Sequence, residues 1–387
     1  MKLLRLVYEW PPPWIGLTPA PYELTRAQAK LGYDIDVLCG RWPKAGELQK
    51  VEGVNVKSFY REPIRATMLL TVAPVVTLYL IFWKLFHKVD VYHVHGHFGL
   101  YFYIYKLIFG FLDKTPVVAH YHICVKARWE ESKKTGKKIN FISRYIDWPL
   151  ALLSDNLALK VAKFYVFVGE KVKNDVVSYY NADPAKCLVV ESGVNPDAFY
   201  RPMDEEKLKL KKDLGYTAED VVICNLGFLV ERKNIHLLIE SLKHLPENFK
   251  LLLVGKAESK YNERLKQIIE SNKLEDRVKF AGEQDYPDVP RFFRASDIFC
   301  LPSVYEGFPK VVLEALACGV PTVASGFKVP QIDGLFELKE FDSKVLSDLL
   351  LIAYKNKENV DSEKVRNEYS WNQRAEVLDK VYKEIIK

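Results

Sequence analysis

Short apolar runs alternate with helix-length segments along the chain, and this alternation constrains the fold more than any other feature of the sequence. An apolar run of four to eight residues between turn signals is typical of a buried strand. Strands that alternate with helices form parallel sheets covered by helices. The expected strands span residues 3–8, 34–39, 54–59, 90–96, 116–122 and 164–169 in the first half, and 221–227, 250–256, 278–282, 298–301 and 322–324 in the second. The sequence therefore predicts an α/β protein with two Rossmann-like domains.

The length of the chain agrees with two domains. It has 387 residues, of which 49% are hydrophobic, enough for two packed cores of ordinary size. We expect one domain over residues 1–200 and a second over 201–370, with a helix over 371–387. The charged stretch from Asp204 to Asp213 is interpreted as a linker region, with a helix as one conformation that it could adopt.

Several classes of protein are disfavoured by the composition. The six cysteines lie far apart and mostly in apolar runs, which favours reduced, buried thiols and a cytoplasmic protein. Glu9 and three prolines interrupt the first apolar run too early for a signal peptide. The net charge of +6 is mild and does not indicate nucleic-acid binding. Neither a G-x-G-x-x-G fingerprint nor a phosphate-binding G-x-x-x-x-G-K-[ST] loop occurs.

The stretch EGFPKVVLE places Glu306 and Glu314 eight residues apart across an expected junction of loop and helix. Pro309 suits a first helical turn. Free backbone N–H groups near Lys310 and Val311 would then point, with the positive end of the helix dipole, at an anion above the loop. A diphosphate fits this description, and the two carboxylates could contact hydroxyl-bearing rings on either side of it.

This stretch, with LPSVYEGFP and ALACGVPTVAS around it, resembles the E-x7-E motif of the GT-B-fold retaining glycosyltransferases, in particular family 4 (glycosyl transferases group 1). The resemblance implies two domains facing across a cleft and a last helix that crosses back to the N-terminal domain. It also implies that Glu306 contacts the donor sugar and Glu314 the ribose, with Gly307 and Phe308 among the donor-binding residues. The alternative is a helix cap and a surface glutamate.

A second landmark, NLGFLVERKNIHLLIESL, resembles the family segment G-R-x-x-x-x-K-G, whose basic pair binds the donor diphosphate. Lys233 matches the lysine, but Phe228 occupies the arginine position, which leaves open whether Arg232 substitutes or both basic residues are simply solvated. In the first loop, Gly16 is expected to approach the donor phosphate. The sequence GFKVPQIDG, at 326–334, replaces the family's Gly-Gly-x-x-Glu loop, which predicts an atypical sugar pocket.

Histidines gather near the ends of two expected strands, at His93, His95, His97, His120 and His122. The first three would share one strand face by the period of two, if the strand runs that far, and this permits a metal site. The resemblance instead expects a histidine at the cleft, which His122 matches best as a catalytic or substrate-orienting residue. A buried structural histidine is the third alternative.

Two apolar stretches raise the question of a membrane. Residues 66–83 carry no charge, but Pro74 and the strand that soon follows argue against a spanning helix. Together with the apolar stretch 98–112 and the basic residues of 126–144, they favour peripheral contact with an anionic membrane surface. Core helices and a solvated basic loop are the alternatives.

These features predict a retaining enzyme that moves a hexose from a UDP- or GDP-linked sugar to a membrane-associated, lipid-linked saccharide. We expect it to act at the cytoplasmic face of the membrane, to need no metal ion or other cofactor, and to bind no nucleic acid. The two alternatives are a non-catalytic, membrane-associated scaffold of the same fold and a sugar-nucleotide epimerase.

Overall fold

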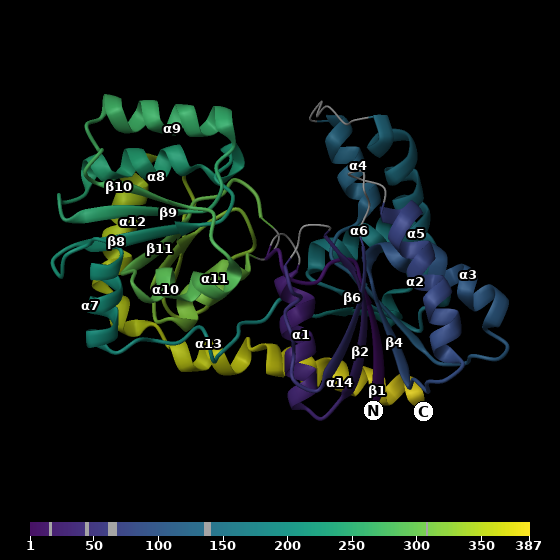
Figure 1. Cartoon of the computed structure of the whole chain (residues 1–387). Coiled ribbons are helices and arrows are strands. Elements are labelled where there is room, and N and C mark those ends of the chain that lie inside the picture. The colour runs from purple at the N-terminus through teal and green to yellow at the C-terminus, as the bar shows by residue number, and fades with distance from the viewer. Residues whose placement is uncertain (15–17, 43–45, 61–67, 135–140, 307–308) are drawn as a thin grey trace. The chain divides into compact units, whose positions relative to one another are not determined.

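The computed structural model describes the chain except residues 15–17, 43–45, 61–67, 135–140 and 307–308 (Figure 1). Three expected donor-binding residues, Gly16, Gly307 and Phe308, therefore lie outside the described residues. The chain forms two compact units, one of residues 1–192 and 371–387 and the other of residues 193–370. The boundary thus follows residue 192, where the sequence suggested residue 200, and the last helix belongs to the first unit.

The first unit contains a seven-stranded parallel sheet in the order β3-β2-β1-β4-β5-β6-β7. Its strands are β1 (Lys2–Val7), β2 (Asp34–Arg41), β3 (Val54–Tyr60), β4 (Val91–His95), β5 (Val117–Tyr121), β6 (Phe164–Phe167) and β7 (Cys187–Val189). Side chains alternate between the two faces of each strand. Leu3 and Val7 of β1 therefore enter one core, and Leu4 and Leu6 enter the other.

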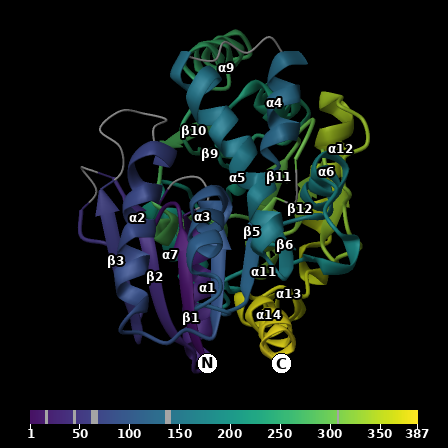
Figure 2. The same cartoon turned by 90° about the vertical axis from the view of Figure 1, so that its right-hand side faces the viewer.

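Helices cover both faces of this sheet. Its helices are α1 (Pro19–Lys30), α2 (Met68–Lys84), α3 (Gly99–Phe109), α4 (Val125–Lys134), α5 (Trp148–Val161), α6 (Glu170–Tyr180) and α14 (Trp371–Ile386). Helices α1 and α14 lie side by side, and Leu24 and Leu378 share the core that contains Leu3 (Figures 1 and 2). Helices α2, α3 and α5 contribute to the core on the other face. The last helix thus completes the first unit, as the resemblance implied.

The second unit contains a six-stranded parallel sheet in the order β10-β9-β8-β11-β12-β13. Its strands are β8 (Val221–Leu226), β9 (Phe249–Val254), β10 (Val278–Gly282), β11 (Ile298–Leu301), β12 (Thr322–Ala324) and β13 (Leu335–Glu337). Its helices are α7 (Asp204–Asp213), α8 (Ile235–Ser241), α9 (Ser259–Ser271), α10 (Val289–Arg294), α11 (Lys310–Ala317), α12 (Ser343–Lys355) and α13 (Ser362–Glu368). The prediction of two Rossmann-like α/β units is confirmed.

One expectation was wrong in part: residues 204–213 are helical, as the sequence allowed, but they form α7 within the second unit and are not a linker between the units. Lys207 and Lys211 each place the ammonium nitrogen against the carboxylate of Asp297, at 2.8 and 2.6 Å. Asp297 is buried, so these lysines satisfy an interior carboxylate instead of facing water. Charge density alone gave no sign of that partner because the two segments are far apart in the sequence.

Among the described helices, none is both long and apolar enough to cross a membrane. The apolar stretch 66–83 corresponds largely to α2, which contains Pro74 within the helix.

Candidate functional site

The loops that follow β8, β11 and β12 meet at one edge of the second sheet because these three strands are neighbours and parallel. Ligands of open α/β sheets bind outside the carboxyl ends of the strands. The loop after β8 contributes Arg232 and Lys233, the loop after β11 contributes Ser303 and Glu306, and the loop after β12 contributes Gly326. The motif residues of two separate sequence landmarks therefore come together.

Glu306 is the centre of this cluster. Its Oε1 accepts hydrogen bonds from Arg232 Nη1 at 2.8 Å and from Ser303 Oγ at 2.9 Å. The Nζ of Lys233 lies 4.0 Å from the same oxygen. The backbone N–H of Glu306 donates to the carbonyl of Gly326 at 2.7 Å, so the atypical loop after β12 helps to hold the glutamate.

The two basic residues differ in exposure. Lys233 is buried, and desolvation lowers the pKa of its ammonium group while the Glu306 carboxylate opposes that shift. Arg232 has half of its side chain exposed and also donates to the carbonyl of Tyr305. Phe228, which occupies the expected arginine position, is largely exposed. Arg232 thus lies in the same cluster as Lys233, and whether it substitutes for the missing arginine stays a prediction.

A glycine is required where Lys233 approaches the end of β8. Gly227 has φ of +135°, and a Cβ atom there would lie 2.4 Å from the Nζ of Lys233. A side chain at this position would therefore both strain the backbone and displace the ammonium group. The glycine places a nearly buried positive charge directly over the backbone, where an anion bound at the loop can reach it.

Glu314 lies in the interior of α11 and is completely buried. Its Oε1 accepts from Lys310 Nζ at 3.2 Å, and its Oε2 has no hydrogen-bond partner among the residues that the structure describes. Such an oxygen calls for a donor from outside the protein, since buried polar atoms are normally paired. Lys310 and Val311 occupy the first turn of α11, as the sequence predicts.

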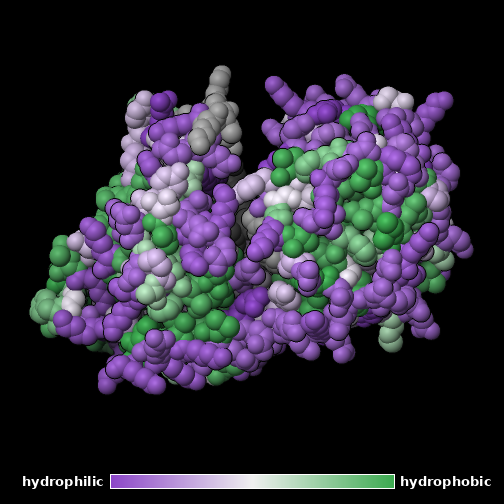
Figure 3. All heavy atoms as spheres, turned by 180° about the vertical axis from the view of Figure 1, so that it is seen from behind, coloured by the Kyte–Doolittle hydropathy of each residue, from purple (hydrophilic) through white to green (hydrophobic). Residues whose placement is uncertain are grey.

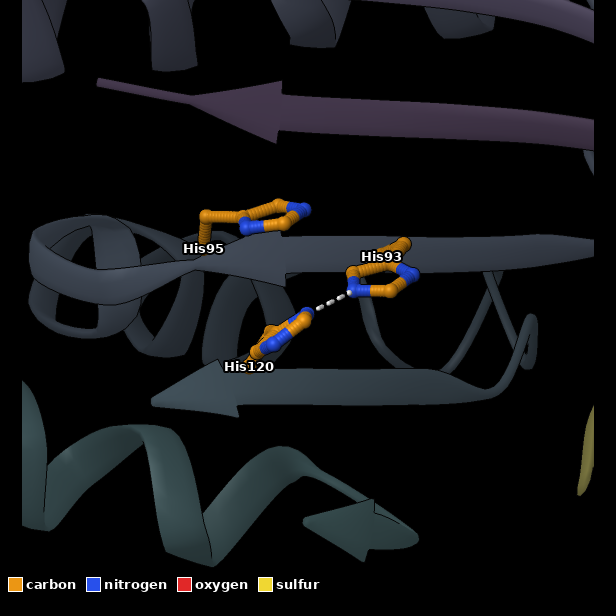
Figure 4. Close-up of side chains that lie close together, drawn as sticks. All are labelled: His93, His95 and His120. Carbon is orange, nitrogen blue, oxygen red and sulfur yellow. Dashed lines mark hydrogen bonds between the residues drawn. The ribbon is translucent and has the colours of Figure 1, made fainter. Parts of the chain in front are cut away.

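The first unit brings four histidines together on the face of the sheet that α1 and α14 cover. His93 and His95 come from β4, His120 from β5 and His122 from just beyond β5. The ring nitrogens His93 Nε2 and His120 Nδ1 are 3.0 Å apart (Figure 4). His95 Nδ1 and His122 Nε2 are 2.9 Å apart. Strand β4 ends at His95. The strand therefore does not run as far as His97, and His97 does not share its face with His93 and His95.

His122 and His95 also line a cavity of about 330 Å³ in the first unit. Its wall contains Arg128, which belongs to the basic stretch 126–144, and Asp155, which the sequence analysis did not single out. Asp155 is buried, and its Oδ2 accepts the backbone N–H of Val125 at 3.0 Å. Desolvation raises the pKa of the Asp155 carboxyl to about 7. In the sequence it is one polar residue within a helical pattern, which is the usual signature of a solvated position.

Known proteins match both halves of the chain. A model described as Glycosyltransferase Family 4 matches residues 16–198, and one described as Glycosyl transferases group 1 matches residues 206–331. An uncharacterised glycosyltransferase of Methanocaldococcus jannaschii is 25% identical over 99% of this chain and 98% of its own. The UDP-Gal:alpha-D-GlcNAc-diphosphoundecaprenol alpha-1,3-galactosyltransferase of Escherichia coli is 25% identical over 87% of this chain and 84% of its own.

Solved structures agree with the fold. Anabaena HepE, crystallised with UDP and glucose, has a TM-score of 0.72 at 19% identity and covers 99% of this chain and 100% of its own. Sucrose-phosphate synthase from Thermosynechococcus elongatus has a TM-score of 0.75 at 17% identity. The match covers 100% of this chain and 99% of the synthase chain.

The two parallel-sheet Rossmann-like units have the GT-B fold, and the two family matches make the chain a glycosyltransferase. More particularly, it belongs to glycosyltransferase family 4.

Proposed function

We propose that this protein transfers a hexose from a UDP- or GDP-linked sugar to a lipid-linked saccharide, with retention of the anomeric configuration. The observation that carries the proposal is the cluster of Arg232, Lys233 and Glu306 at the same sheet edge as the buried Glu314. UDP and glucose in the HepE crystals support a nucleotide-sugar donor. The diphosphoundecaprenol-linked substrate named for the Escherichia coli relative supports a lipid-linked acceptor.

Each residue of the cluster has a role in this proposal. Lys233, Arg232 and the N-terminus of α11 bind the donor diphosphate and stabilise the negative charge that develops on it as it leaves. When Arg232 turns to the diphosphate, Glu306 becomes available for the hydroxyls of the donor sugar. The free oxygen of Glu314 accepts a hydrogen bond from the ribose.

The first unit contributes His122 in this proposal. His122 lines the cavity beside His95 and orients a substrate hydroxyl there. Retention follows from attack on the same face of the sugar from which the diphosphate leaves, with a diphosphate oxygen as the base.

The reaction itself is tested with a radiolabelled donor. The full-length protein is incubated with UDP- or GDP-linked hexose and a lipid extract that contains diphosphate-linked saccharides. We expect label to move into the organic phase, and we expect digestion of the product with anomer-specific glycosidases to show the anomeric configuration of the donor. Release of free sugar without labelled lipid, for every donor and extract, would contradict the proposed acceptor class.

We expect transfer activity to survive exhaustive treatment with EDTA. Lys233, Arg232 and the helix N-terminus supply the positive charge that a metal ion provides at other diphosphate sites. The measurement is the initial rate of the labelled transfer before and after chelation, with dialysed protein as the control. A loss of activity that zinc or manganese restores would show instead that transfer depends on a bound metal ion.

We further propose that the first unit rests on an anionic membrane surface through α2 and α3. Apolar residues gather on the outer edge of that unit, where these helices lie (Figure 3). The exposed apolar side chains of this surface, which we call the α2–α3 face, are Leu78, Phe82, Leu85, Phe86, Leu107, Ile108, Phe111 and Leu112. An exposed apolar surface of this kind marks a binding site for a membrane or a protein.

Changing both Leu107 and Phe111 to Glu should abolish flotation of the protein with vesicles that contain an anionic lipid. Each side chain is 71% exposed, so the change removes apolar contact area without disturbing the core. Wild-type binding should weaken but persist at about 1 M salt, where the Debye length is only about 3 Å and electrostatic attraction is screened.

The matched control is Phe341→Glu, because Phe341 is also exposed but lies in the second unit. This variant should float like the wild type. Absence of wild-type flotation even at low salt would refute the membrane proposal and leave the α2–α3 face as a surface for another protein.

A further inference from the structure

Two nitrogens of the histidine cluster are buried without a partner. The Nε2 atoms of His95 and His120 form no hydrogen bond with any residue that the structure describes. The two side chains are only 2% and 5% exposed. An unsatisfied buried polar group costs about 1–3 kcal/mol, so two in one cluster require an explanation. A cavity of about 10 Å³ borders both rings, which is about the space of one water molecule or one bare ion.

The cluster has the spacing of a metal site. One ring nitrogen each from His93, His95 and His120 lies within 4.8 Å of the other two (Figure 4). Zn–N bonds of about 2.0–2.1 Å in a tetrahedral site place ligand nitrogens about 3.4 Å apart. His93 Nε2 is 3.0 Å from His120 Nδ1, so the His120 ring must turn to bring its unpaired Nε2 to the ion, and the His95 ring must move with it.

The chemistry of these rings suits a particular class of ion. Burial lowers the pKa of all three imidazoles well below the usual value, so their lone pairs are available at neutral pH. Neutral imidazole prefers late first-row transition metals, and three histidines with one open position form a familiar zinc arrangement. Calcium and magnesium are disfavoured because they require oxygen ligands.

We propose that His93, His95 and His120 bind one divalent transition-metal ion of the zinc class, with an open coordination position toward the neighbouring cavity. The ion would replace the hydrogen bond between His93 and His120. This site lies in the first unit and goes beyond the proposed transfer reaction, which is expected to proceed without a metal ion. Its natural role would be inhibitory, because His95 is the hydrogen-bond partner of His122.

The surroundings of the site both support and limit its affinity. The Tyr382 hydroxyl contacts His93 Nδ1 and accepts from Gln28 Nε2, which fixes the orientation of the His93 ring. Arg5 lies opposite His93 in the sheet and is completely buried. Its positive charge lowers the pKa of the rings and also opposes a bound cation. We therefore expect a site of moderate affinity.

The test is a titration of the metal-free, full-length protein with Co²⁺. Binding is monitored by the visible d–d absorption of the bound cobalt ion. We expect one equivalent to bind with the strong bands of a four-coordinate ion, and Zn²⁺ to displace it. His120→Ala should remove these bands. Tyr382→Phe should weaken binding about tenfold or more, because it removes only the group that orients His93. His244→Ala, at an exposed histidine of the second unit, is the control and should bind like the wild type.

Circular dichroism establishes which variants are folded. If His120→Ala fails to fold, His95→Gln and Tyr382→Phe decide the question. The proposal is overturned if the wild type gives no four-coordinate cobalt spectrum, or if folded variants of His95 or His120 keep it unchanged. Because the readout is a spectrum and not an activity, a negative result would leave the proposed transfer reaction standing.

Discussion

Glu306→Gln should lower the rate of sugar transfer by about 100-fold or more while leaving the affinity for the nucleoside diphosphate nearly unchanged. The substitution keeps the size of the side chain and its hydrogen bond with Ser303 but removes the charge that Arg232 and Lys233 face. In our proposal, Glu306 contacts the sugar and not the nucleotide. The loss should therefore appear in kcat, measured with the labelled donor at saturating concentration.

The matched variant is Glu314→Gln, which changes the other glutamate of the motif in the same way. Because the free oxygen of Glu314 is assigned to the ribose, this variant should weaken nucleotide binding by about 1–3 kcal/mol, or roughly 5- to 150-fold. Calorimetric titration with the nucleoside diphosphate measures both variants. If both lose the same affinity for the nucleotide, the division of roles between the two glutamates is wrong.

The second large effect concerns stability. Asp155→Asn should stabilise the protein at pH 8 by up to about 4 kcal/mol, because the carboxyl has a pKa near 7 when buried and an ordinary one when unfolded. At a pH between the unfolded and the folded pKa of Asp155, the unfolded chain has released the carboxyl proton and the folded chain retains it. The wild type therefore loses stability as the pH rises toward 7. Asn keeps an oxygen that can accept the N–H of Val125.

Urea unfolding of both proteins at several pH values tests this prediction. The difference in unfolding free energy should be largest at pH 8 and should shrink by about 1.4 kcal/mol per pH unit below pH 7. The control is Asp276→Asn, at an exposed carboxylate, which should show no such trend. A difference between wild type and Asp155→Asn that is independent of pH would mean that Asp155 is not held protonated by burial.

Much of the fold was predictable because strands in a parallel sheet are buried on both faces and read as apolar runs. The runs at 298–301 and 322–324 became β11 and β12 with the same bounds. Strands β7 and β13 were not predicted: each is a three-residue strand at the edge of its sheet and is not fully buried, whereas β12, which is equally short, is buried along its whole length. Residues 204–213 were misinterpreted because their charged side chains pair with a buried carboxylate that is distant in the sequence.

The candidate site was predictable where a motif is local and unpredictable where it depends on packing. The spacing of Glu306 and Glu314 and the positions of Lys233 and His122 are visible in the sequence. Whether Arg232 replaces a missing arginine depends on how the loop after β8 folds back toward Glu306, which no local pattern reports. Asp155 was missed for the same reason. The roles of these residues in donor binding and catalysis remain predictions.

The central claim is that the second unit binds a nucleoside diphosphate-sugar through the cluster around Glu306 and Glu314. The most direct test is a thermal-shift panel of UDP, GDP, ADP and their sugars, since a ligand that binds the folded state raises the melting temperature by mass action. We predict that UDP or GDP raises Tm in the wild type, that the shift persists in Glu306→Gln, and that it falls sharply in Glu314→Gln. A panel in which no nucleotide raises Tm, or in which Glu314→Gln responds like the wild type, would contradict the account.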